Sequence, residues 1–352
     1  MTAAAQDRIV GGTPHHGRIR VGVLGTSEFA RRRMMAAIRG HPGAELAAVA
    51  SRDPARAAHT AAQHGCAAAA DYGELLARDD IDAVYLPLPN ALHHEWALAA
   101  MESGKHVLAE KPLTTSAADT AELVGVAART GRVLRENFCF LHHGQHRTVR
   151  DLLRGGRIGR LRRFTGAFCI PPRPAADVRH RPELGGGALL DTGVYPIRAA
   201  QFFLGDDLSV TGALLRQDAA TGVDVGGSAL LRAAGGEIVT VDFGFEHGYG
   251  SLYQLWGSEG RLTLERAFTP PPDLAPVLRV DRQGEPVHTV LPAEDQYAAT
   301  VGAFAAAVRR ARDLGTDPDH QAWAAAAVRT AELVEEISRC AQHITVETRE
   351  RG

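Results

Sequence analysis

The chain of 352 residues has little of what marks several classes of protein. Its four cysteines, Cys66, Cys139, Cys169 and Cys340, form no CxxC pair and match no zinc spacing. The formal net charge of -2 leaves no basic field for a nucleic acid. Apolar runs stay short of the roughly 18 residues of a membrane span, and the N-terminus has no continuous apolar segment of a signal peptide. We therefore expect a cytoplasmic protein with free, buried thiols that binds neither nucleic acid nor membrane.

The pattern of apolar runs changes at about residue 140. Before it, short apolar strands such as "IRVGVLG" (19–25) alternate with helical patterns such as 27–40. This alternation predicts an α/β unit, a parallel sheet covered on both faces. After it come mostly strand-like runs, which predict an α+β domain with an open, mainly antiparallel sheet. We predict a flexible leader over 1–17, a Rossmann dinucleotide-binding domain over 18–140, and a substrate-binding and oligomerisation domain over 141–345.

Two long helical patterns close the chain. The second, "DHQAWAAAAVRTAELVEEISRCAQH", predicts a helix that reaches His343. An open sheet usually buries one face against a copy of itself, so we expect a homodimer or a homotetramer.

The turn "GTSEFA" follows the first predicted strand and opens the first helix. The dinucleotide-binding fingerprint needs a tight turn, a close backbone approach to the pyrophosphate and a small residue against the sheet. Gly25 and Ala30 fit the first and third positions, and Ser27 stands where the second glycine is expected. The free N–H groups of a helix N-terminus still suit a phosphate. An ordinary strand-to-helix turn is the alternative.

The end of the second strand, "AVASRD", indicates which dinucleotide binds. NAD enzymes usually place an acid there for the ribose hydroxyls. Here Ser51 and Arg52 take that place, and Asp53 suits the cap of the following helix. An arginine fits a 2′-phosphate, and Arg32 and Arg33 on the first helix could add positive charge. The sequence therefore favours NADP(H) over NAD(H).

The stretch "AEKPL" follows another predicted strand, so its charged residues lie at the edge where ligands bind. Lys111, fixed by Pro112, could point at the nicotinamide and protonate an alkoxide formed from a ketone. A surface lysine at a strand end is the alternative. Downstream, Asp191 and Tyr195 lie four residues apart, on one face of a helix that follows three glycines. They suit a sugar hydroxyl or carbonyl, or else a cap and a half-buried tyrosine.

These stretches have a family in common. "GTSEFARRR", "PLPNALHHEWALAAMESGKHVLAEKPL" and "GGGALLDTGVYPIRAAQFFLG" resemble the Gfo/Idh/MocA oxidoreductases over residues 19 to about 345. The resemblance implies that Lys111 lies beside the nicotinamide, with Asp191 and Tyr195 across the substrate. With the turn and strand-end residues, it assigns to the cofactor site Gly25, Thr26, Ser27, Phe29, Ala30, Arg32, Arg33, Ser51, Arg52, Tyr72, Leu86, Asn90, His93, Glu110, Lys111 and Asn137.

Within this family, "LRENFCFLHHGQH" and "IPPRPAADVRHRPELGGGALLD" are similar to C-3 ketoreductases that act on nucleotide-linked 3-keto-deoxysugars in antibiotic biosynthesis. We therefore expect NADPH-dependent reduction of a dTDP-linked 3-keto-6-deoxyhexose. Two alternatives stay open: a dehydrogenase of a free polyol, inositol or sugar, and a ligand-sensing regulator without turnover. Keeping both Lys111 and Tyr195 argues against the regulator.

Lys111 and Tyr195 are both candidates for the proton donor. Burial lowers the pKa of lysines and raises that of tyrosines, which favours Lys111, with Tyr195 as hydrogen-bond partner or alternative donor. Arg179 and Arg181 are candidates for the diphosphate of the sugar nucleotide. The histidines of "HHGQH" (142–146) have a spacing that could suggest zinc, but no cysteine or carboxylate cluster supports it, so we expect no metal.

Overall fold

The computed structural model describes residues 17–347, so the leader predicted over 1–17 lies outside the described residues except for its last position. The first domain is built on a six-stranded sheet with the strand order β3-β2-β1-β4-β5-β6, and every pair in it is parallel. This confirms the predicted Rossmann-type sheet. Its strands are β1 (Ile19–Leu24), β2 (Ala44–Ala50), β3 (Ala67–Ala68), β4 (Ala83–Leu86), β5 (His106–Ala109) and β6 (Leu134–Glu136).

Helices cover both faces of this sheet and bury a separate apolar cluster on each. One cluster includes Met34 and Ile38, and the other includes Leu75, Met101 and Leu123. The helices are a π-helical turn (Ala30–Met34) leading into α1 (Met35–Gly40), α2 (Pro54–His64), α3 (Tyr72–Ala77), a 3₁₀ turn (Asn90–Leu92) leading into α4 (His93–Glu102), and α5 (Ala117–Thr130).

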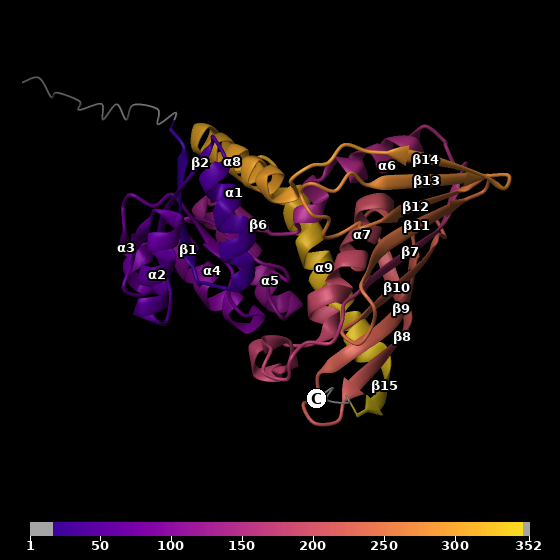
Figure 1. Ribbon diagram of the computed structural model, residues 1–352, viewed down its shortest axis with the longest axis horizontal. Coiled ribbons are helices and arrows are strands. Elements are labelled where there is room, and N and C mark those ends of the chain that lie inside the picture. The colour runs from indigo at the N-terminus through magenta and orange to yellow at the C-terminus, as the bar shows by residue number, and fades with distance from the viewer. Residues whose placement is uncertain (1–16, 348–352) are drawn as a thin grey trace, which may run out of the picture.

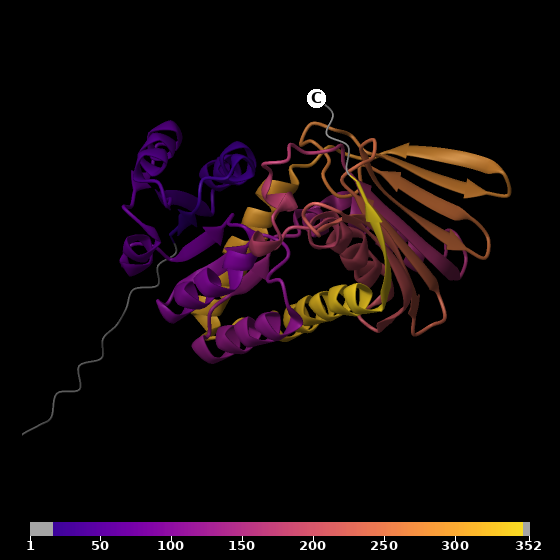
Figure 2. The same cartoon turned by 90° about the horizontal axis from the view of Figure 1, so that it is seen from below.

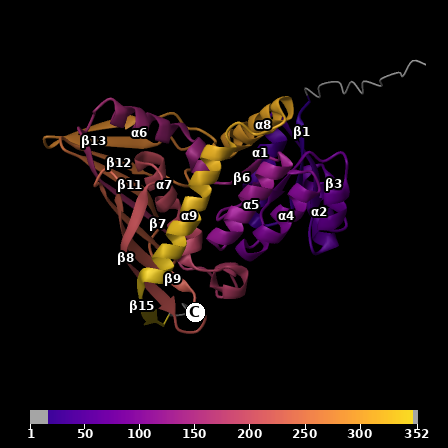
Figure 3. The same ribbon diagram turned by 180° about the vertical axis from the view of Figure 1, so that it is seen from behind.

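One helix of the first domain comes from the far end of the chain. Helix α8 (Gln296–Leu314) lies against α1 and β2, and its Val301, Phe304 and Val308 complete the cluster that contains Met34. Figure 1 shows this orange helix beside the indigo N-terminal elements. Helix α9 (His320–Cys340) then runs from the first domain back to the second, as Figure 3 shows. The two domains therefore share the last part of the chain, whichever residue is taken as their boundary.

The second domain is built on a nine-stranded sheet with the order β14-β13-β12-β11-β7-β10-β9-β8-β15. Only the pairs β7–β10 and β8–β15 are parallel, so the prediction of a mainly antiparallel sheet is confirmed. Its strands are β7 (Leu161–Cys169), β8 (Leu208–Asp218), β9 (Asp224–Ala233), β10 (Ile238–Gly244), β11 (Gly250–Gly257), β12 (Arg261–Glu265), β13 (Val277–Arg282), β14 (Glu285–Val290) and β15 (Ala341–Val346).

One face of this sheet packs against helices, and among the described residues no helix covers the other face (Figure 2). Helix α7 (Val194–Leu204) lies on β7 and β10, and α9 lies on β8. The remaining helical segments are 3₁₀ turns at Cys139–His142, Val178–His180 and Pro182–Leu184, α6 (Gly144–Arg154), and a π-helical turn (Leu189–Gly193) that continues as α7 (Val194–Leu204). No helix in the described part of the chain is long and apolar enough to cross a membrane.

The structure corrects three expectations. The last helix ends at Cys340 instead of reaching His343, because residues 341–346 pair with the free edge of β8 as strand β15. The hairpin of β13 and β14 was not predicted, and it extends the sheet beyond β12. All four thiols are free, but only Cys139 is buried, and Cys340 is exposed at the end of α9.

The shared helix α8 gives a prediction about stability. Phe304 is 4% exposed in the cluster on the first sheet, whereas Leu314, at the end of the same helix, is 62% exposed. Phe304→Ala should lower the free energy of unfolding by about 3–5 kcal/mol because it leaves a cavity, while Leu314→Ala should change it by less than about 0.5 kcal/mol. Urea unfolding of both variants measures this difference. Equal effects would show that α8 is not part of the first core.

Candidate active site

The predicted site residues gather along one edge of the parallel sheet. Gly25 follows β1, Ser51 follows β2, Leu86 ends β4, Lys111 follows β5 and Asn137 follows β6. Because these strands are parallel, all five positions lie at their carboxyl ends, where ligands bind in open α/β sheets.

The turn after β1 brings backbone close to this edge. Gly25 has φ +118°, and a Cβ there would lie 3.1 Å from the Leu88 side chain, so a glycine is required. The hydroxyl of Ser27 accepts a hydrogen bond from the N–H of Ala30 at 3.2 Å, which caps the helix that follows. Thr26 is buried, and Phe29 is exposed. A tight glycine turn that opens a helix fits a pyrophosphate.

The end of β2 lacks a free carboxylate, as predicted. Ser51 is buried, and its hydroxyl accepts the N–H of Asp53 at 3.2 Å. The Asp53 carboxylate accepts two N–H groups of the first turn of α2, so it caps that helix. Arg52 is exposed and makes no ion pair within residues 17–347, so its guanidinium is available to an anionic ligand.

Three other residues predicted to bind the cofactor, Tyr72, Arg32 and Arg33, have different neighbours. Burial raises the pKa of Tyr72, and the nearby Arg52 charge offsets part of that rise. Arg32 pairs with the exposed Glu28 at 3.0 Å, and the Arg33 guanidinium lies 5.9 Å from the ring centre of Tyr297. Of these three arginines, Arg52 is the one without an ion pair or a ring contact among residues 17–347, and its role at a 2′-phosphate stays a prediction.

Asn90 and His93 hold loops together. Asn90 Nδ2 donates to the carbonyl of Gly185 at 2.8 Å, which ties the loop after β4 to the glycine run. His93 is buried, with Nδ1 2.8 Å from the carbonyl of Pro112 and Nε2 2.9 Å from that of Leu88. Burial lowers the pKa of His93, and the carbonyls of Pro112 and Leu88 offset part of this fall. The His93 ring clamps the segment that carries Lys111.

Lys111 joins the two domains. Its Nζ donates to Asp191 Oδ1 at 2.5 Å and to the Asp191 carbonyl at 2.7 Å, and it lies 5.1 Å from the ring centre of Tyr195. The peptide bond between Lys111 and Pro112 is cis. The structure therefore brings together the lysine, the aspartate and the tyrosine that the sequence singled out in separate segments.

Asp191 is an ionised carboxylate between two cations. Its second oxygen, Oδ2, accepts a hydrogen bond from Arg179 Nε at 2.5 Å, and Arg179 also pairs with Asp177. Burial raises the pKa of the Asp191 carboxyl, but the Lys111 and Arg179 charges outweigh it and hold that pKa well below its usual range. Arg179 thus already forms ion pairs with two carboxylates, those of Asp177 and Asp191. The Nε atom of Arg181 lies 3.9 Å from Oε1 of Glu183. The diphosphate role expected for both arginines stays a prediction.

The ring of Tyr195 is surrounded by aromatic side chains. It packs edge-on against Phe168 at 4.9 Å and Phe138 at 5.6 Å between centres, and tilted against Phe268 at 5.7 Å. Burial raises the pKa of Tyr195 well above its ordinary value, and the Glu110 charge adds to this effect. The hydroxyl makes no hydrogen bond to another described residue. It is therefore a neutral group free to contact a substrate.

The carboxylate of Glu110, the residue before Lys111, accepts hydrogen bonds from two side chains. Its Oε1 accepts the hydroxyl of Tyr85 and the side-chain N–H of Asn137, both at 2.6 Å. Burial raises the pKa of Glu110, although these two donors and the adjacent Lys111 partly counteract it. Glu110 and Asn137, assigned to the cofactor by the resemblance, thus also brace the strand end that carries Lys111.

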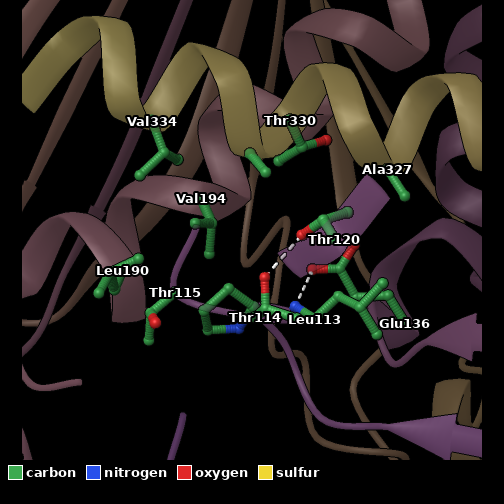
Figure 4. A pocket seen from close by; sticks show the side chains of 12 residues that line it. Leu113, Thr114, Thr115, Thr120, Glu136, Leu190, Val194, Ala327, Thr330 and Val334 are labelled. Atoms are coloured by element: carbon green, nitrogen blue, oxygen red, sulfur yellow. Dashed lines mark hydrogen bonds between the residues drawn. The ribbon is translucent and has the colours of Figure 1, made fainter. Parts of the chain in front are cut away.

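Glu136 is a residue of this site that the sequence analysis did not single out. Figure 4 shows its carboxylate reaching Leu113, whose N–H donates to Glu136 Oε1 at 2.8 Å, in a cavity closed by α9. Burial raises the pKa of Glu136 to about 7, although Arg198 lowers it in part. The signal in the sequence was a carboxylate at the end of an apolar strand, in "LRENF".

The histidines of "HHGQH" serve the fold. His146 is buried with Nδ1 3.0 Å from the Tyr253 hydroxyl and Nε2 2.9 Å from the carbonyl of Ala267. His143 Nδ1 accepts the N–H of Gln145 and caps α6. Among the described residues, the one trio of side chains close enough to share a metal is His94, Asp119 and Glu122, which does not include them.

The site is typical of a two-domain, dinucleotide-dependent oxidoreductase. It has a glycine turn, an arginine in place of the ribose acid, and a lysine that an aspartate of the other domain holds. Two family profiles agree with this class. The oxidoreductase family with an NAD-binding Rossmann fold matches residues 19–138, and the GFO/IDH/MocA C-terminal domain matches residues 146–263. The chain belongs to the GFO/IDH/MocA family of oxidoreductases.

Curated relatives and solved structures cover nearly the whole chain. The dTDP-3,4-didehydro-2,6-dideoxy-α-D-glucose 3-reductase of Saccharopolyspora spinosa is 51% identical over 91% of this chain and 97% of its own. The enzyme of the same name from Streptomyces violaceoruber is 50% identical over 93% of this chain and 97% of its own. A 3-ketoreductase from Actinomadura kijaniata, solved in complex with NADP and TDP-benzene, superimposes with a TM-score of 0.89 at 46% identity, covering 94% and 99% of the two chains. Structures of that enzyme include variants of one lysine and one tyrosine.

The end of β2 predicts a cofactor preference. A charge-assisted contact from Arg52 contributes about 1.5–3 kcal/mol, so NADPH should bind about tenfold to a hundredfold tighter than NADH. Arg52→Ala should remove most of that preference, whereas Arg39→Ala, an exposed arginine at the far end of α1, should leave it intact. Fluorescence titration with both dinucleotides measures the ratio. Equal binding of NADH and NADPH by the unchanged protein would contradict the assignment.

Glu136 predicts a pH dependence of stability. Its pKa is about 7 in the folded protein against an ordinary 4.5, so the folded state holds this proton longer than the unfolded chain does. Ionisation of Glu136 therefore lowers the free energy of unfolding as the pH rises from about 4.5 to above 7. Glu136→Gln keeps an oxygen for the N–H of Leu113 but cannot ionise.

The difference in free energy of unfolding between Glu136→Gln and the unchanged protein should thus grow in favour of the variant between about pH 5 and 8, by at most about 3 kcal/mol. Urea unfolding at both pH values measures it. A difference that does not vary with pH would show that Glu136 titrates in its ordinary range.

Proposed function

We propose that this chain reduces the C-3 ketone of a dTDP-linked 3-keto-6-deoxyhexose with NADPH. The observation that carries the proposal is the contact of Lys111 with Asp191, beside Tyr195, at the ligand-binding edge of the first sheet. The sequence of the chain is similar, over nearly their full length, to relatives that are named dTDP-sugar 3-reductases, and this similarity supports the substrate class.

The residues at the sheet edge fit NADP(H). The turn at Gly25 would receive the pyrophosphate, and Ser51 with Arg52 would hold the 2′-phosphate. When bound, the dinucleotide supplies a hydride to the carbonyl carbon of the substrate. The related ketoreductase from Actinomadura kijaniata was solved with NADP, which supports the same cofactor here.

Lys111 is the proposed proton donor. A lysine ammonium has three N–H donors, and Asp191 engages two of them, through Oδ1 and through its carbonyl. The third can donate to the substrate oxygen. As negative charge develops on that oxygen, the ammonium stabilises it and then transfers the proton.

Arg179 keeps the Asp191 carboxylate paired with a cation during this transfer. When Lys111 gives up its proton, Asp191 loses one of its two cationic partners, and Arg179 remains on Oδ2. The carboxylate therefore stays ionised and in place and can hold the neutral amine until it is protonated again. A buried carboxylate left without a cation would be costly.

Tyr195 is the proposed hydrogen-bond partner of the same substrate oxygen. Its raised pKa keeps its own proton in place, so it orients the carbonyl as a neutral donor. In the Actinomadura kijaniata enzyme the lysine and the tyrosine that were varied are separated by the same number of residues as Lys111 and Tyr195.

The homodimer or homotetramer expected from the sequence belongs to the same proposal. The uncovered face of the second sheet carries a row that alternates cations with exposed apolar side chains: Arg232, Ile238, Arg163 and Trp256, opposite one another on β9, β10, β7 and β11. Such a mixed row suits an interface between copies of the chain. A cytoplasmic location likewise stays a prediction.

The direction of cofactor turnover tests the function. We expect oxidation of NADPH with a dTDP-linked 3-keto-deoxysugar, and no reduction of NADP+ with free inositol or xylose. Turnover of the free polyols alone would favour the polyol dehydrogenase, and binding without any turnover would favour the regulator.

The same assay separates the roles of the two donors. Lys111→Met should lower kcat by about 10²–10⁴ while NADPH binding survives, because it removes the general acid. Tyr195→Phe keeps the ring among its aromatic neighbours and should cost less, mainly by disturbing substrate orientation. An inactive Tyr195→Phe beside a Lys111→Met of near-normal kcat would reverse the two roles.

A further inference from the structure

The helix that carries Asp191 and Tyr195 begins without a cap of its own. It follows Gly185, Gly186 and Gly187, which have the greatest backbone freedom, and no side chain of its first turn bonds to its free N–H groups. Yet Asp191 lies within two residues of this uncapped start. Something else must fix where the helix begins.

The helix start is held by the side chain of Asp224, the first residue of β9. Its Oδ2 accepts the N–H of Leu189 at 2.6 Å, across 35 positions of the chain. The fit is close: Gly187 has φ +120°, and a Cβ at that position would collide with Asp224 Oδ1. Burial raises the pKa of Asp224 to about 6, although the backbone N–H groups of Leu189 and Ala188 lower it in part.

Packing does not replace this hydrogen bond. A cavity of about 310 Å³ borders the same turn and is lined by Gly185, Gly186, Leu190, Asp224 and His343 among others. Ala188 and Leu189 pack into the core of the second domain on the other side of the turn, but apolar contacts cannot accept the N–H of Leu189, which would lose its partner if the carboxylate were removed.

We propose that Asp224 is a positioning residue: its carboxylate caps the helix from another strand and so sets where Asp191 and Tyr195 stand relative to Lys111. The inference rests on the proposed function for its kinetic consequence, but not for its structural one. A displacement of about 1 Å at a catalytic group can cost as much as a hundredfold in rate.

Two variants of Asp224 test it. Asp224→Ala removes the acceptor and should lower kcat at least about tenfold, with NADPH affinity unchanged, because the cofactor edge is not touched. Asp224→Asn keeps an oxygen that can accept the Leu189 N–H and should restore most of kcat. Hydrogen exchange should speed up in residues 187–195 of Asp224→Ala and not in Asp224→Asn.

Asp218→Ala is the matched control. Asp218 caps the turn that leads from β8 to β9, accepting the N–H groups of Ala220 and Thr221, so its loss loosens the same hairpin without touching Leu189. It should lower Tm but leave kcat and the exchange of 187–195 near normal. Equal loss of kcat in Asp218→Ala and Asp224→Ala, or an unchanged kcat in Asp224→Ala, would overturn the inference. If the unchanged enzyme reduces no keto-sugar nucleotide, the proposed function fails, and the exchange pattern still decides the role of Asp224.

Discussion

One carboxylate, Asp191, holds the site together. It faces Lys111 from the first domain and Arg179 from the loop before its own helix. Taking a carboxylate out of water is costly unless cations and hydrogen bonds replace the water. Here two cations do so at 2.5 Å each, which keeps the group ionised. Because one of these cations belongs to the other domain, the chemistry depends on how the two domains are placed.

The two long helices near the C-terminus, α8 and α9, fix that placement. Helix α8 completes the core of the first domain, and α9 returns from there to the second sheet. Arg135 of β6 pairs with the buried Asp317 between the two helices at 2.6 Å, and the Glu335 carboxylate accepts the N–H of Ala117 at 2.7 Å. The same helix α9 closes the cavity around Glu136. The domains are therefore held together along α9 and the segment before it, in addition to the contact of Lys111 with Asp191.

Much of this was predictable because it follows from local patterns. Continuous apolar strands, the Asp53 cap and the glycine stop of α2 are local signals, and the structure confirms them. The family resemblance placed Lys111 and Asp191 in one site, on opposite sides of the substrate, but it did not predict their direct contact, since residues 80 apart meet through tertiary structure. Strand β15 was missed because a helical pattern continues into it, and the edge of β8 decides the outcome. Asp224 and Glu136 act on backbone N–H groups far away in the sequence, and no spacing rule points to such partners.

The place of α8 also bears on how the chain folds as it is made. Strand β6 ends at Glu136, but the helix that covers Met34 and Ile38 begins only at Gln296. At about 5–20 residues per second, a ribosome needs on the order of ten seconds or more to make the stretch between them. Throughout that interval one apolar face of the nascent Rossmann sheet, on which α1 already lies, lacks the part of its cover that α8 supplies. This enzyme cannot finish its first domain before its second, so its two halves mature together at the end of synthesis.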